Sequence, residues 1–538
     1  MASEYDIIIC GSGSGGGFLA GEVAPHASVL ILESGPKTVG TPDPGVGSPE
    51  SRRASTQINV GTYIPDGVTS INRGKYFYSY PIYLDQSNPT FASNQREARI
   101  VGGGSHINAG AWIRPFAGDF AGFANETGVT GWSKADFEPH FLKAEQILSV
   151  HRDGRENWNI GSKLYEQAAT AMGIPVFETA SNRRRCLFCG QRLNAGMPCK
   201  YDSLMSTAVT QIPKALSFGA ELLDNTTVLR VEISNGKATG VTYSRNGQVT
   251  TVTARKLVVV AGGALGTPAI LNDSGLNKIN DNVGRYLRMH PAGSIEAVIP
   301  GTEWNVERGY QWNAHHYVMD GSKARDVIVH IGGGLQSATP WTTAQFGTFG
   351  RPFKNLIRDF PNRLGVFMFS LKPGIYGRVV GGVAKPIALY PLIGKDGVIE
   401  PKTLSDLEAA YQQIGEVLKR MGATYITPNP NEPSALLRQE LRTLMLIGAV
   451  PHPQGTCRAG ASRTNSVVDS NCMSHDVSNL MICDASVIPK DVGANPNAMI
   501  MAIASKCSDF VVKQILGKSV GSEETASQFE AVANMVKA

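Results

Sequence analysis

The chain has 538 residues, of which 42% are hydrophobic and 18% charged, a composition that excludes a disordered or collagen-like protein. The net charge of +5 is modest, and the one basic run, 183–185, has no interleaved aromatic residues, which argues against a nucleic-acid partner. No uncharged apolar stretch reaches the roughly 18 residues of a membrane span, and the N-terminus lacks the basic region of a signal peptide. We therefore expect a cytoplasmic globular protein, with periplasmic export on a partner subunit left open.

The first predicted elements are a short buried strand, a glycine-rich loop, a helix and a second strand, in the order of a dinucleotide-binding motif. Gly11, Gly13 and Gly16 match the pattern G-x-G-x-x-G. The first glycine permits a tight turn, the second lets the backbone approach a pyrophosphate, and the third lets helix and strand pack closely. Glu33 ends the second strand and would accept hydrogen bonds from ribose hydroxyls. This motif predicts a dinucleotide site but does not separate FAD from NAD.

Later apolar runs predict that the same sheet resumes after long insertions. A second glycine turn occupies 102–104, and a third follows the apolar run 256–261. Strands of the dinucleotide fold are expected near 5–10, 29–33, 223–231, 256–261 and 480–484. The spacing predicts one nucleotide-binding domain assembled from separated segments, with a second domain inserted between them.

Further blocks of the sequence share their order and composition with one protein family. They are Arg99–Asn108, Gly131–Glu145, Ala261–Gly275, Asn282–His290, His452–Gly460, Ser466–Asp469, Asn479–Pro489 and Asn495–Asn497. With the N-terminal glycine loop, they resemble the glucose–methanol–choline (GMC) flavoprotein oxidoreductases. The resemblance implies FAD bound in an extended conformation and hydride transfer from an alcohol carbon to the flavin.

The resemblance also implies an α/β fold with a discontinuous, Rossmann-like FAD-binding domain and an inserted substrate domain made of an antiparallel sheet and helices. We assign to the FAD-binding domain residues 1–40, 95–129, 216–290 and 451–518. We assign to the substrate domain residues 41–94, 130–215 and 291–450. Residues 519–538 form a C-terminal tail, for which a docking helix and a frayed end are both open.

Alcohol oxidation needs a base for the hydroxyl proton and an electron acceptor held at the face of the C–H bond. The flavin supplies the acceptor, so the protein must supply the base, and imidazole suits this role. By resemblance, His452 is the base and Asn495 is the hydrogen-bond partner of the substrate oxygen. A structural histidine and a turn residue before Pro496 are the alternatives.

Other residues are implied to surround the cofactor. Asp484 closes an apolar strand and would bind the ribityl or pyrophosphate part of FAD, with a helix N-cap as its alternative. Gly103 and Asn108 would lie beside the flavin, and the backbone of Val228 would meet the adenine. The full cofactor set is Gly11, Gly13, Gly16, Glu33, Gly103, Asn108, Val228, Asp484, Asn495 and Pro496.

The second glycine turn also bears on how FAD is held. Some relatives attach FAD covalently through a histidine directly before the position that matches Asn108, where this chain has Ile107. We therefore expect non-covalent FAD and interpret His106 as a packing or flavin-facing residue.

Three of the eight cysteines form a C-x2-C-x9-C cluster in a basic loop, at Cys186, Cys189 and Cys199. Three thiolates in one segment could hold an iron–sulfur cluster or zinc, and free thiols or a local disulfide are the alternatives. A cluster would pass electrons to an acceptor protein or small subunit, whereas without one a quinone-like acceptor or O2 stays open. The other five cysteines are expected to be buried thiols.

The leading function is FAD-dependent oxidation of a primary or secondary alcohol, with sugar and aryl compounds among the candidate small-molecule substrates. A non-redox lyase of the same fold is the closest rival. A flavin-bearing electron-transfer subunit of a larger dehydrogenase complex is the rival from another class.

Overall fold

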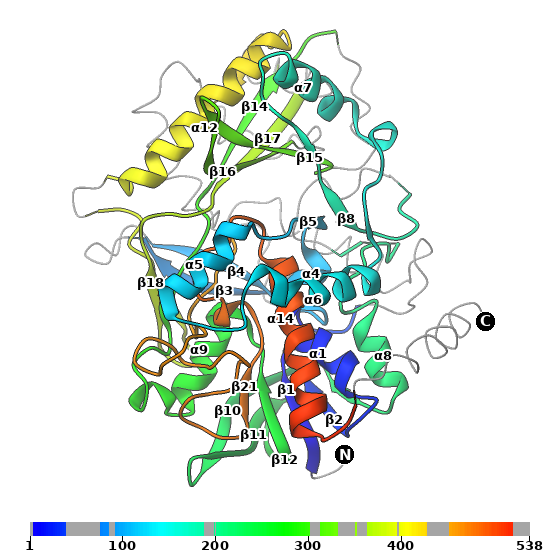
Figure 1. The fold of residues 1–538 in the computed structure, drawn as a ribbon, viewed down its shortest axis with the longest axis vertical. Helices are drawn as coiled ribbons and strands as arrows, with labels where there is room; N and C mark the ends of the chain where they lie inside the picture. The colour runs from blue at the N-terminus through cyan, green and yellow to red at the C-terminus, as the bar shows by residue number, and fades with distance from the viewer. Residues whose placement is uncertain are drawn as a thin grey trace.

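The computed structural model describes residues 4–38, 76–84, 92–187, 198–199, 201–301, 312–331, 350–351, 354, 363–394, 398–427 and 451–519. These residues form two large sheets that lie at opposite ends of the molecule, with helices beside each of them (Figure 1). The lower sheet in that view contains the first strands of the chain, and the upper sheet is built mainly from residues between 292 and 427. This mixed α/β architecture confirms the predicted fold class.

The lower sheet has a parallel centre, in which the strands lie in the order β21, β12, β1, β2, β9. Their bounds are Leu480–Ile482, Gln248–Val260, Glu4–Cys10, Val29–Leu32 and Glu221–Leu223. Two further strands, β10 (Thr226–Ser234) and β11 (Lys237–Arg245), extend it in antiparallel fashion past β12. The apolar runs in β1, β2 and β12 are fully buried, as expected for parallel strands covered on both faces.

One predicted strand of this sheet differs in detail from the observed structure. The expected strand near 223–231 is two strands, β9 and β10, separated by a turn at Asp224 and Asn225. Asn225 has a positive φ of 49°, a conformation that asparagine adopts more readily than most residues and that ends an extended run. The chain therefore leaves the parallel edge at β9 and returns as the outer antiparallel strand β10.

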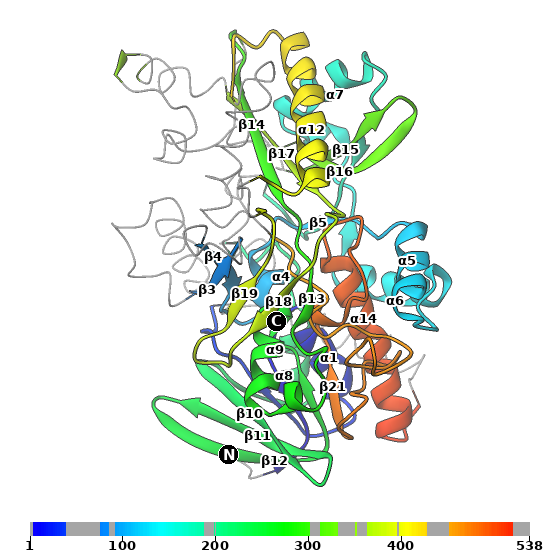
Figure 2. The ribbon, with the colours of Figure 1, turned by 90° about the vertical axis from the view of Figure 1, so that its left-hand side faces the viewer.

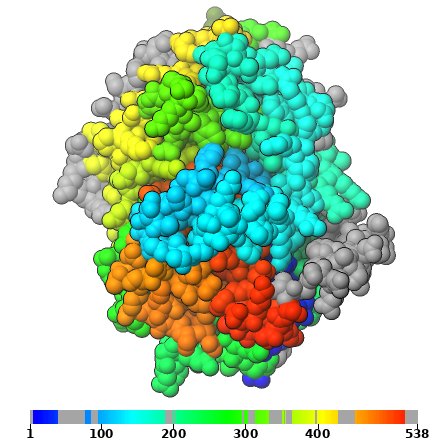
Figure 3. Space-filling model, viewed as in Figure 1, coloured from blue at the N-terminus to red at the C-terminus, as the bar shows by residue number. Residues whose placement is uncertain are grey.

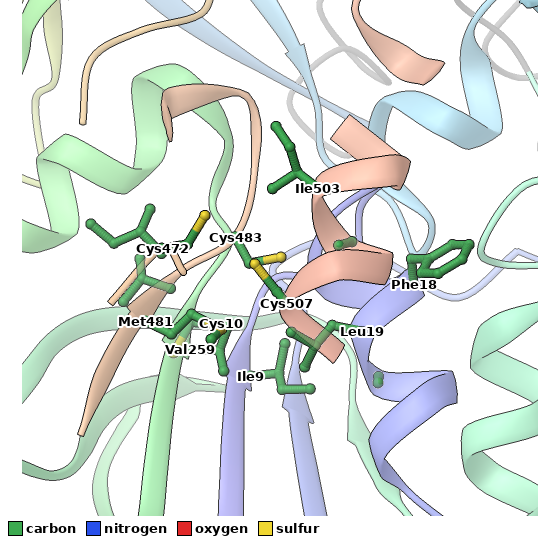
Figure 4. Close-up of a cluster of buried hydrophobic side chains, with 14 of the residues drawn as sticks. Ile9, Cys10, Phe18, Leu19, Val259, Cys472, Met481, Cys483, Ile503 and Cys507 are labelled. Carbon is green, nitrogen blue, oxygen red and sulfur yellow. The ribbon is translucent and has the colours of Figure 1, made fainter. Parts of the chain in front are cut away.

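Helices on both sides bury the parallel strands. Helix α1 (Gly16–Val23) packs against α14 (Asn497–Phe510), while α9 (Gly263–Asp273) packs against β10. Figure 4 shows Ile9 of β1, Leu19 of α1 and Ile503 of α14 in one buried cluster, and none of the three is accessible to solvent. Burying an aliphatic side chain of this size contributes about 1.5–3 kcal/mol, so this core joins the two ends of the sequence.

The upper sheet is antiparallel throughout, and its strands lie in the order β20, β14, β17, β16, β15, β7. Their bounds are Tyr425–Thr427, Ala292–Val298, Arg363–Ser370, Lys323–Ile331, Ala314–Asp320 and Phe177–Glu178. Helix α12 (Pro401–Arg420) runs along this sheet and contacts α7 (Ile160–Thr170) (Figure 2). The predicted antiparallel sheet with flanking helices is confirmed. The assignment of segments to two domains stays a prediction, and residues 520–538 of the tail lie outside the described part.

Smaller elements connect the two large sheets. A third sheet holds β3 (Phe77–Tyr83), β4 (Ala92–Ala98), β13 (Arg285–Leu287), β18 (Gly377–Val380) and β19 (Ile387–Leu389). Helices α5 (Ala117–Thr127) and α6 (Lys134–Ile147) form the cyan band that crosses the middle of the face shown in Figure 3. Among the residues that the structure describes, no helix is both long and apolar enough to cross a membrane.

Candidate active site

A cavity of about 700 Å³ is lined both by the N-terminal glycine loop and by strands β16 and β17 of the antiparallel sheet. The predicted site residues that line it are Gly11, Gly13, Glu33, Gly103, Asn108, Val228, His452, Asp484, Asn495 and Pro496. Gly16 is absent from the described lining and lies buried at the start of α1. The structure therefore brings the predicted cofactor and catalytic residues, with the exception of Gly16, to one cavity.

The glycines of the loop differ in what a side chain would meet. Gly11 has a positive φ of 113°, and a Cβ there would collide with the Ala261 carbonyl. A Cβ at Gly16 would collide with the Gly11 carbonyl, whereas a Cβ at Gly13 would have only Gly103 nearby, at 3.8 Å. These surroundings match a turn glycine, a packing glycine and a glycine open to the cavity. Sequence reasoning missed Gly15, where a Cβ would collide with the carbonyl of Cys483.

Glu33 is buried at the end of β2, and its side chain holds the glycine loop through hydrogen bonds. Its carboxylate accepts hydrogen bonds from the Ser12 N–H at 3.0 Å, the Ser12 hydroxyl at 2.7 Å and the Gly35 N–H at 2.8 Å. Burial raises the pKa of Glu33, and these donors oppose the rise. Ser12 Oγ also accepts from the Gly102 N–H at 3.0 Å. Ser12, which no sequence signal singled out, thus joins the first glycine loop to the second glycine turn.

Asp484 lies where β21 ends, and it both lines the cavity and caps a short helix. Its carboxylate accepts from the Gly263 N–H at 2.8 Å, the Thr267 hydroxyl at 2.5 Å and the Ser486 N–H at 2.7 Å. Ser486 belongs to the 3-10 helix η5 (Ala485–Val487). Burial raises the pKa of Asp484. The structure therefore shows the N-cap, and the binding of the ribityl or pyrophosphate part of FAD by Asp484 stays a prediction.

A second acid of the cavity, Glu97 on β4, was missed by the sequence reasoning. It is half-buried, and Gln95 Nε2 donates to its Oε1 at 3.4 Å. Desolvation raises the pKa of Glu97 to about 7, with a smaller contribution from the negative charge of Asp484. A carboxyl in this state is protonated in a large fraction of molecules at neutral pH.

His452 lies at the end of the cavity beside the antiparallel sheet. It has a positive φ of 68°, which is strained for a residue with a side chain and is typical of functional sites. His452 is half-buried and lines the cavity, and its Nε2 lies 3.5 Å from Nδ2 of Asn495. Desolvation by the surrounding atoms lowers its pKa to about 3, with His330 adding to the effect. The imidazole is therefore neutral at physiological pH.

His330 on β16 completes this end of the cavity. Its Nε2 lies 3.1 Å from Oδ1 of Asn495, and burial lowers its pKa to about 4. Three aromatic side chains also line the cavity here, namely Trp312, Phe367 and Phe369. The Phe369 ring lies 5.4 Å from the His452 ring between centroids. Sequence analysis missed His330 because it belongs to an ordinary alternating strand, without a motif around it.

The second glycine turn holds His106 away from the cavity. The turn begins at Gly102 with φ of 91° and leads into the short helix α4 (Gly103–Ile107). The His106 ring is fully buried, with Nδ1 2.9 Å from the Ser206 hydroxyl and Nε2 3.4 Å from the Thr38 hydroxyl. These contacts fit the packing interpretation of His106.

The three-cysteine cluster is only partly within the described residues. Cys186 and Cys199 are half-buried free thiols, and Cys189 lies outside the described part. Within the described part, no three His, Cys, Asp or Glu side chains are placed to hold a metal ion, and a metal site including Cys189 stays a prediction. The other five cysteines are buried, as predicted. Figure 4 shows Cys472, Cys483 and Cys507 close together in the core.

Comparison with known proteins defines the class of this chain. Residues 29–292 match the N-terminal family model of the GMC oxidoreductases, and residues 390–504 match the C-terminal one. The chain therefore belongs to the GMC oxidoreductase family, as the sequence blocks predicted.

Individual proteins match most of the length of the chain in sequence or in fold. The chain is 24% identical to human mitochondrial choline dehydrogenase, over 95% of this chain and 90% of that one. Its fold is similar to pyridoxine 4-oxidase from Mesorbium loti, with a TM-score of 0.67 and 20% identity over 94% and 98% of the two chains. It is also similar to an Aspergillus oryzae formate oxidase variant studied for FAD modification, with a TM-score of 0.69 and 15% identity over 95% and 98%. The family and these neighbours support FAD as the cofactor.

Proposed function

We propose that the protein oxidises a primary or secondary alcohol with FAD, and that His452 is the base. The observation that carries this proposal is the position of His452 Nε2, 3.5 Å from Asn495 Nδ2, in the same cavity that the glycine loop lines. An alcohol hydroxyl loses its proton most readily where a neutral imidazole can accept the proton and an amide N–H can donate to the oxygen. His452 and Asn495 lie close enough together to do both.

The residues of the cavity fit FAD. Gly13 leaves open the space that a side chain would fill, and this lets a pyrophosphate approach the backbone. Glu33 and Val228 line the cavity with it, where we propose that they meet the ribose and the adenine, and Asp484 would bind the ribityl or pyrophosphate part. When bound, FAD supplies the acceptor for the hydride. His106 makes its hydrogen bonds outside the cavity lining, which supports non-covalent binding.

The proton step uses two side chains. The alcohol oxygen would lie between His452 Nε2 and Asn495 Nδ2, so that its proton passes to Nε2 while the amide donates to the oxygen. Because the His452 pKa is lowered to about 3, the ring is free of its second proton at neutral pH and can accept one. The carbon that bears the alcohol oxygen would then give up its hydrogen as a hydride, for which FAD would be the acceptor. The product is an aldehyde from a primary alcohol or a ketone from a secondary one.

The walls near His452 support an apolar or aryl alcohol as the substrate class. Trp312, Phe367 and Phe369 present ring surfaces, with 4.8 Å between the centroids of Trp312 and Phe367. A sugar would leave hydroxyls facing these rings without hydrogen-bond partners, which costs binding energy for each group.

The experiment is an anaerobic visible spectrum of the purified protein with benzyl alcohol, choline and glucose in turn. We expect benzyl alcohol to bleach the flavin band fastest, and His452→Ala to keep FAD but slow the bleaching by at least about 100-fold. His151→Ala, an exposed histidine, is the matched control.

Each other outcome has a definite meaning. Equal bleaching rates in His452→Ala and the wild type would contradict the base role. A flavin band that no alcohol bleaches would contradict alcohol oxidation and favour a lyase or an electron-transfer subunit. Recovery of the band in air identifies an oxidase, and a bleached band that persists in air identifies a dehydrogenase.

A further inference from the structure

Two stretches of backbone hold two histidine rings against each other at the end of the cavity. Arg288 and Gln454 exchange backbone hydrogen bonds of 2.9 Å each, and the His290 N–H donates to the Pro451 carbonyl at 2.9 Å. The His290 and His452 rings are nearly perpendicular, at 80°, and their Nδ1 atoms are 3.0 Å apart. At this distance one Nδ1 carries a hydrogen and the other accepts it.

Contacts extend from this pair in both directions and form a chain of five side chains. On one side, Nε2 of His290 lies 3.2 Å from Gln454 Nε2. On the other side, Nε2 of His452 faces Asn495, whose Oδ1 faces Nε2 of His330. Desolvation lowers the pKa of all three histidines, to about 3 for His452, to about 4 for His330 and well below the usual value for His290. Each ring is therefore neutral and carries one hydrogen.

The positions of the hydrogens follow from the His330 end. Among the described residues, Nδ1 of His330 is buried without a hydrogen-bond partner, a situation that a bare nitrogen tolerates better than an N–H group does. The hydrogen of His330 is therefore on Nε2 and is donated to Asn495 Oδ1. The Asn495 amide then presents its N–H groups to His452 Nε2, which must be bare. The hydrogen of His452 is consequently on Nδ1 and is donated to His290.

Gln454 is the last side chain in this series of five. Because His290 accepts at Nδ1, it carries its hydrogen on Nε2 and needs an acceptor there. Gln454 Oε1 is fully buried and has no hydrogen-bond partner within the described part of the chain. The nitrogen and oxygen of an amide occupy nearly the same volume. A half-turn of the Gln454 amide brings Oε1 to His290 Nε2, in place of the long bond of 3.4 Å that Gln454 Nε2 donates to the His452 carbonyl. It also moves the NH2 group to the position where Oε1 has no partner, so the His330 end, and not the Gln454 end, sets the direction of the chain.

We propose that His290 and Gln454 are positioning residues that keep the hydrogen of His452 on Nδ1 and leave its Nε2 bare on the Asn495 side. The proposal rests on the proposed function of His452 as the base. In the opposite arrangement, the Gln454 amide donates to His290, His290 donates to His452, and Nε2 of His452 carries the hydrogen. That tautomer cannot accept a proton at Nε2, so the orientation of one buried amide decides whether the base is ready.

The experiment is long-range ¹H–¹⁵N NMR of the FAD-loaded protein labelled with ¹⁵N-histidine, which distinguishes a bare ring nitrogen from one that carries hydrogen. The His452 signals are those that disappear in His452→Gln. We expect the wild type and Gln454→Glu, measured at an alkaline pH where the introduced carboxylate is ionised and only accepts, to carry the His452 hydrogen on Nδ1. Gln454→Leu, which neither donates nor accepts, should give a mixture of both tautomers. Flavin reduction in Gln454→Leu should be about tenfold or more slower than in Gln454→Glu.

Hydrogen on Nε2 of His452 in the wild type would overturn the proposal, and so would identical His452 signals in the two Gln454 variants. If a variant fails to fold, the wild-type spectrum alone decides. Since the tautomer is measured without turnover, this result is independent of the base role. Unchanged flavin reduction in His452→Ala would remove the base role while leaving the tautomer assignment intact.

Discussion

The two ends of the cavity are built in different ways. At the cofactor end, the backbone is shaped by missing atoms, because a Cβ at Gly11 or Gly15 would collide with a carbonyl. At the reactive end, His330, His452 and Asn495 come from three distant segments and meet through side-chain contacts of 3.1 and 3.5 Å. The comparison teaches that the first end tolerates no added carbon at Gly11 or Gly15, whereas the second depends on where each hydrogen lies.

Gly15→Ala is expected to have the largest effect, because its methyl group would collide with the Cys483 carbonyl and the backbone must shift. We expect a loss of more than about 4 kcal/mol in the free energy of unfolding, measured by thermal or chemical denaturation. Gly118→Ala in α5 is the control, since no atom lies within 4 Å of its added Cβ. A Gly15→Ala variant with the wild-type Tm would show that the cofactor end accepts a side chain at this position.

Gly13→Ala tests the cofactor end without disturbing the fold. The nearest atom to its added Cβ, the Gly103 Cα, is at 3.8 Å, which is ordinary contact. The protein should fold normally, while the methyl group would crowd the approach of FAD that we propose at Gly13. Crowding of this kind costs up to about 3 kcal/mol, or about 100-fold in the FAD dissociation constant. Titration of the apoprotein with FAD measures it, and unchanged affinity would refute the role of Gly13.

Glu97 differs from the glycines at the cofactor end, because its side chain, and not the shape of the backbone, affects the stability of the protein. Its pKa is raised from 4.5 to about 7, so the folded protein binds more protons than the unfolded chain between these values. The stability contribution of Glu97 is therefore largest below pH 4.5 and is lost as the pH rises to about 7.

Glu97→Gln removes this pH dependence. With allowance for its partial exposure, we expect the variant to be about 2 kcal/mol more stable than the wild type at pH 8, and the difference to vanish near pH 4.5. Urea denaturation at the two pH values checks this, with the exposed Glu156→Gln as the control. An equal difference at both pH values would show that Glu97 acts through packing rather than through its charge.

The smallest expected effect concerns the pH profile of the reactive end. We propose that His452 is the base, which works only when it is unprotonated, and its pKa is lowered to about 3. The rate of flavin reduction should therefore stay level from pH 8 down to pH 5.5. An imidazole with the ordinary pKa near 6.5 would lose about tenfold by pH 5.5. Stopped-flow reduction across this range measures the slope, and a tenfold fall would contradict a desolvated His452.

Sequence reasoning placed the residues of the glycine loop better than the cavity residues that lie on ordinary strands, for a physical reason. Gly11, Gly13 and Glu33 belong to one local unit of strand, loop, helix and strand, so their spacing alone carries the geometry. His330 and Glu97 lie on strands whose pattern resembles any other half-buried strand, and only tertiary packing brings them to the cavity.

The hydrogen bonds from His452 to His290 and Gln454 could not be predicted from the sequence either. Gln454 and His290 are separated by 164 residues and meet through their side chains and neighbouring backbone. The sequence blocks contained both residues, yet spacing could not show that their side chains touch. The parallel strands were predicted well because continuous apolar runs need no partner to be recognised, whereas the break between β9 and β10 depended on the turn at Asn225.

The pairing of β12 has a consequence for the order in which the protein is made. Val258, Val259 and Val260 pair with β1 on one side and with β21, some 220 residues further along, on the other. At a synthesis rate of about 5–20 residues per second, β12 waits roughly 10–45 s on the ribosome before its second neighbour exists. During that interval the apolar edge of β12 that later pairs with β21 has no partner strand, so this edge of the sheet is completed last.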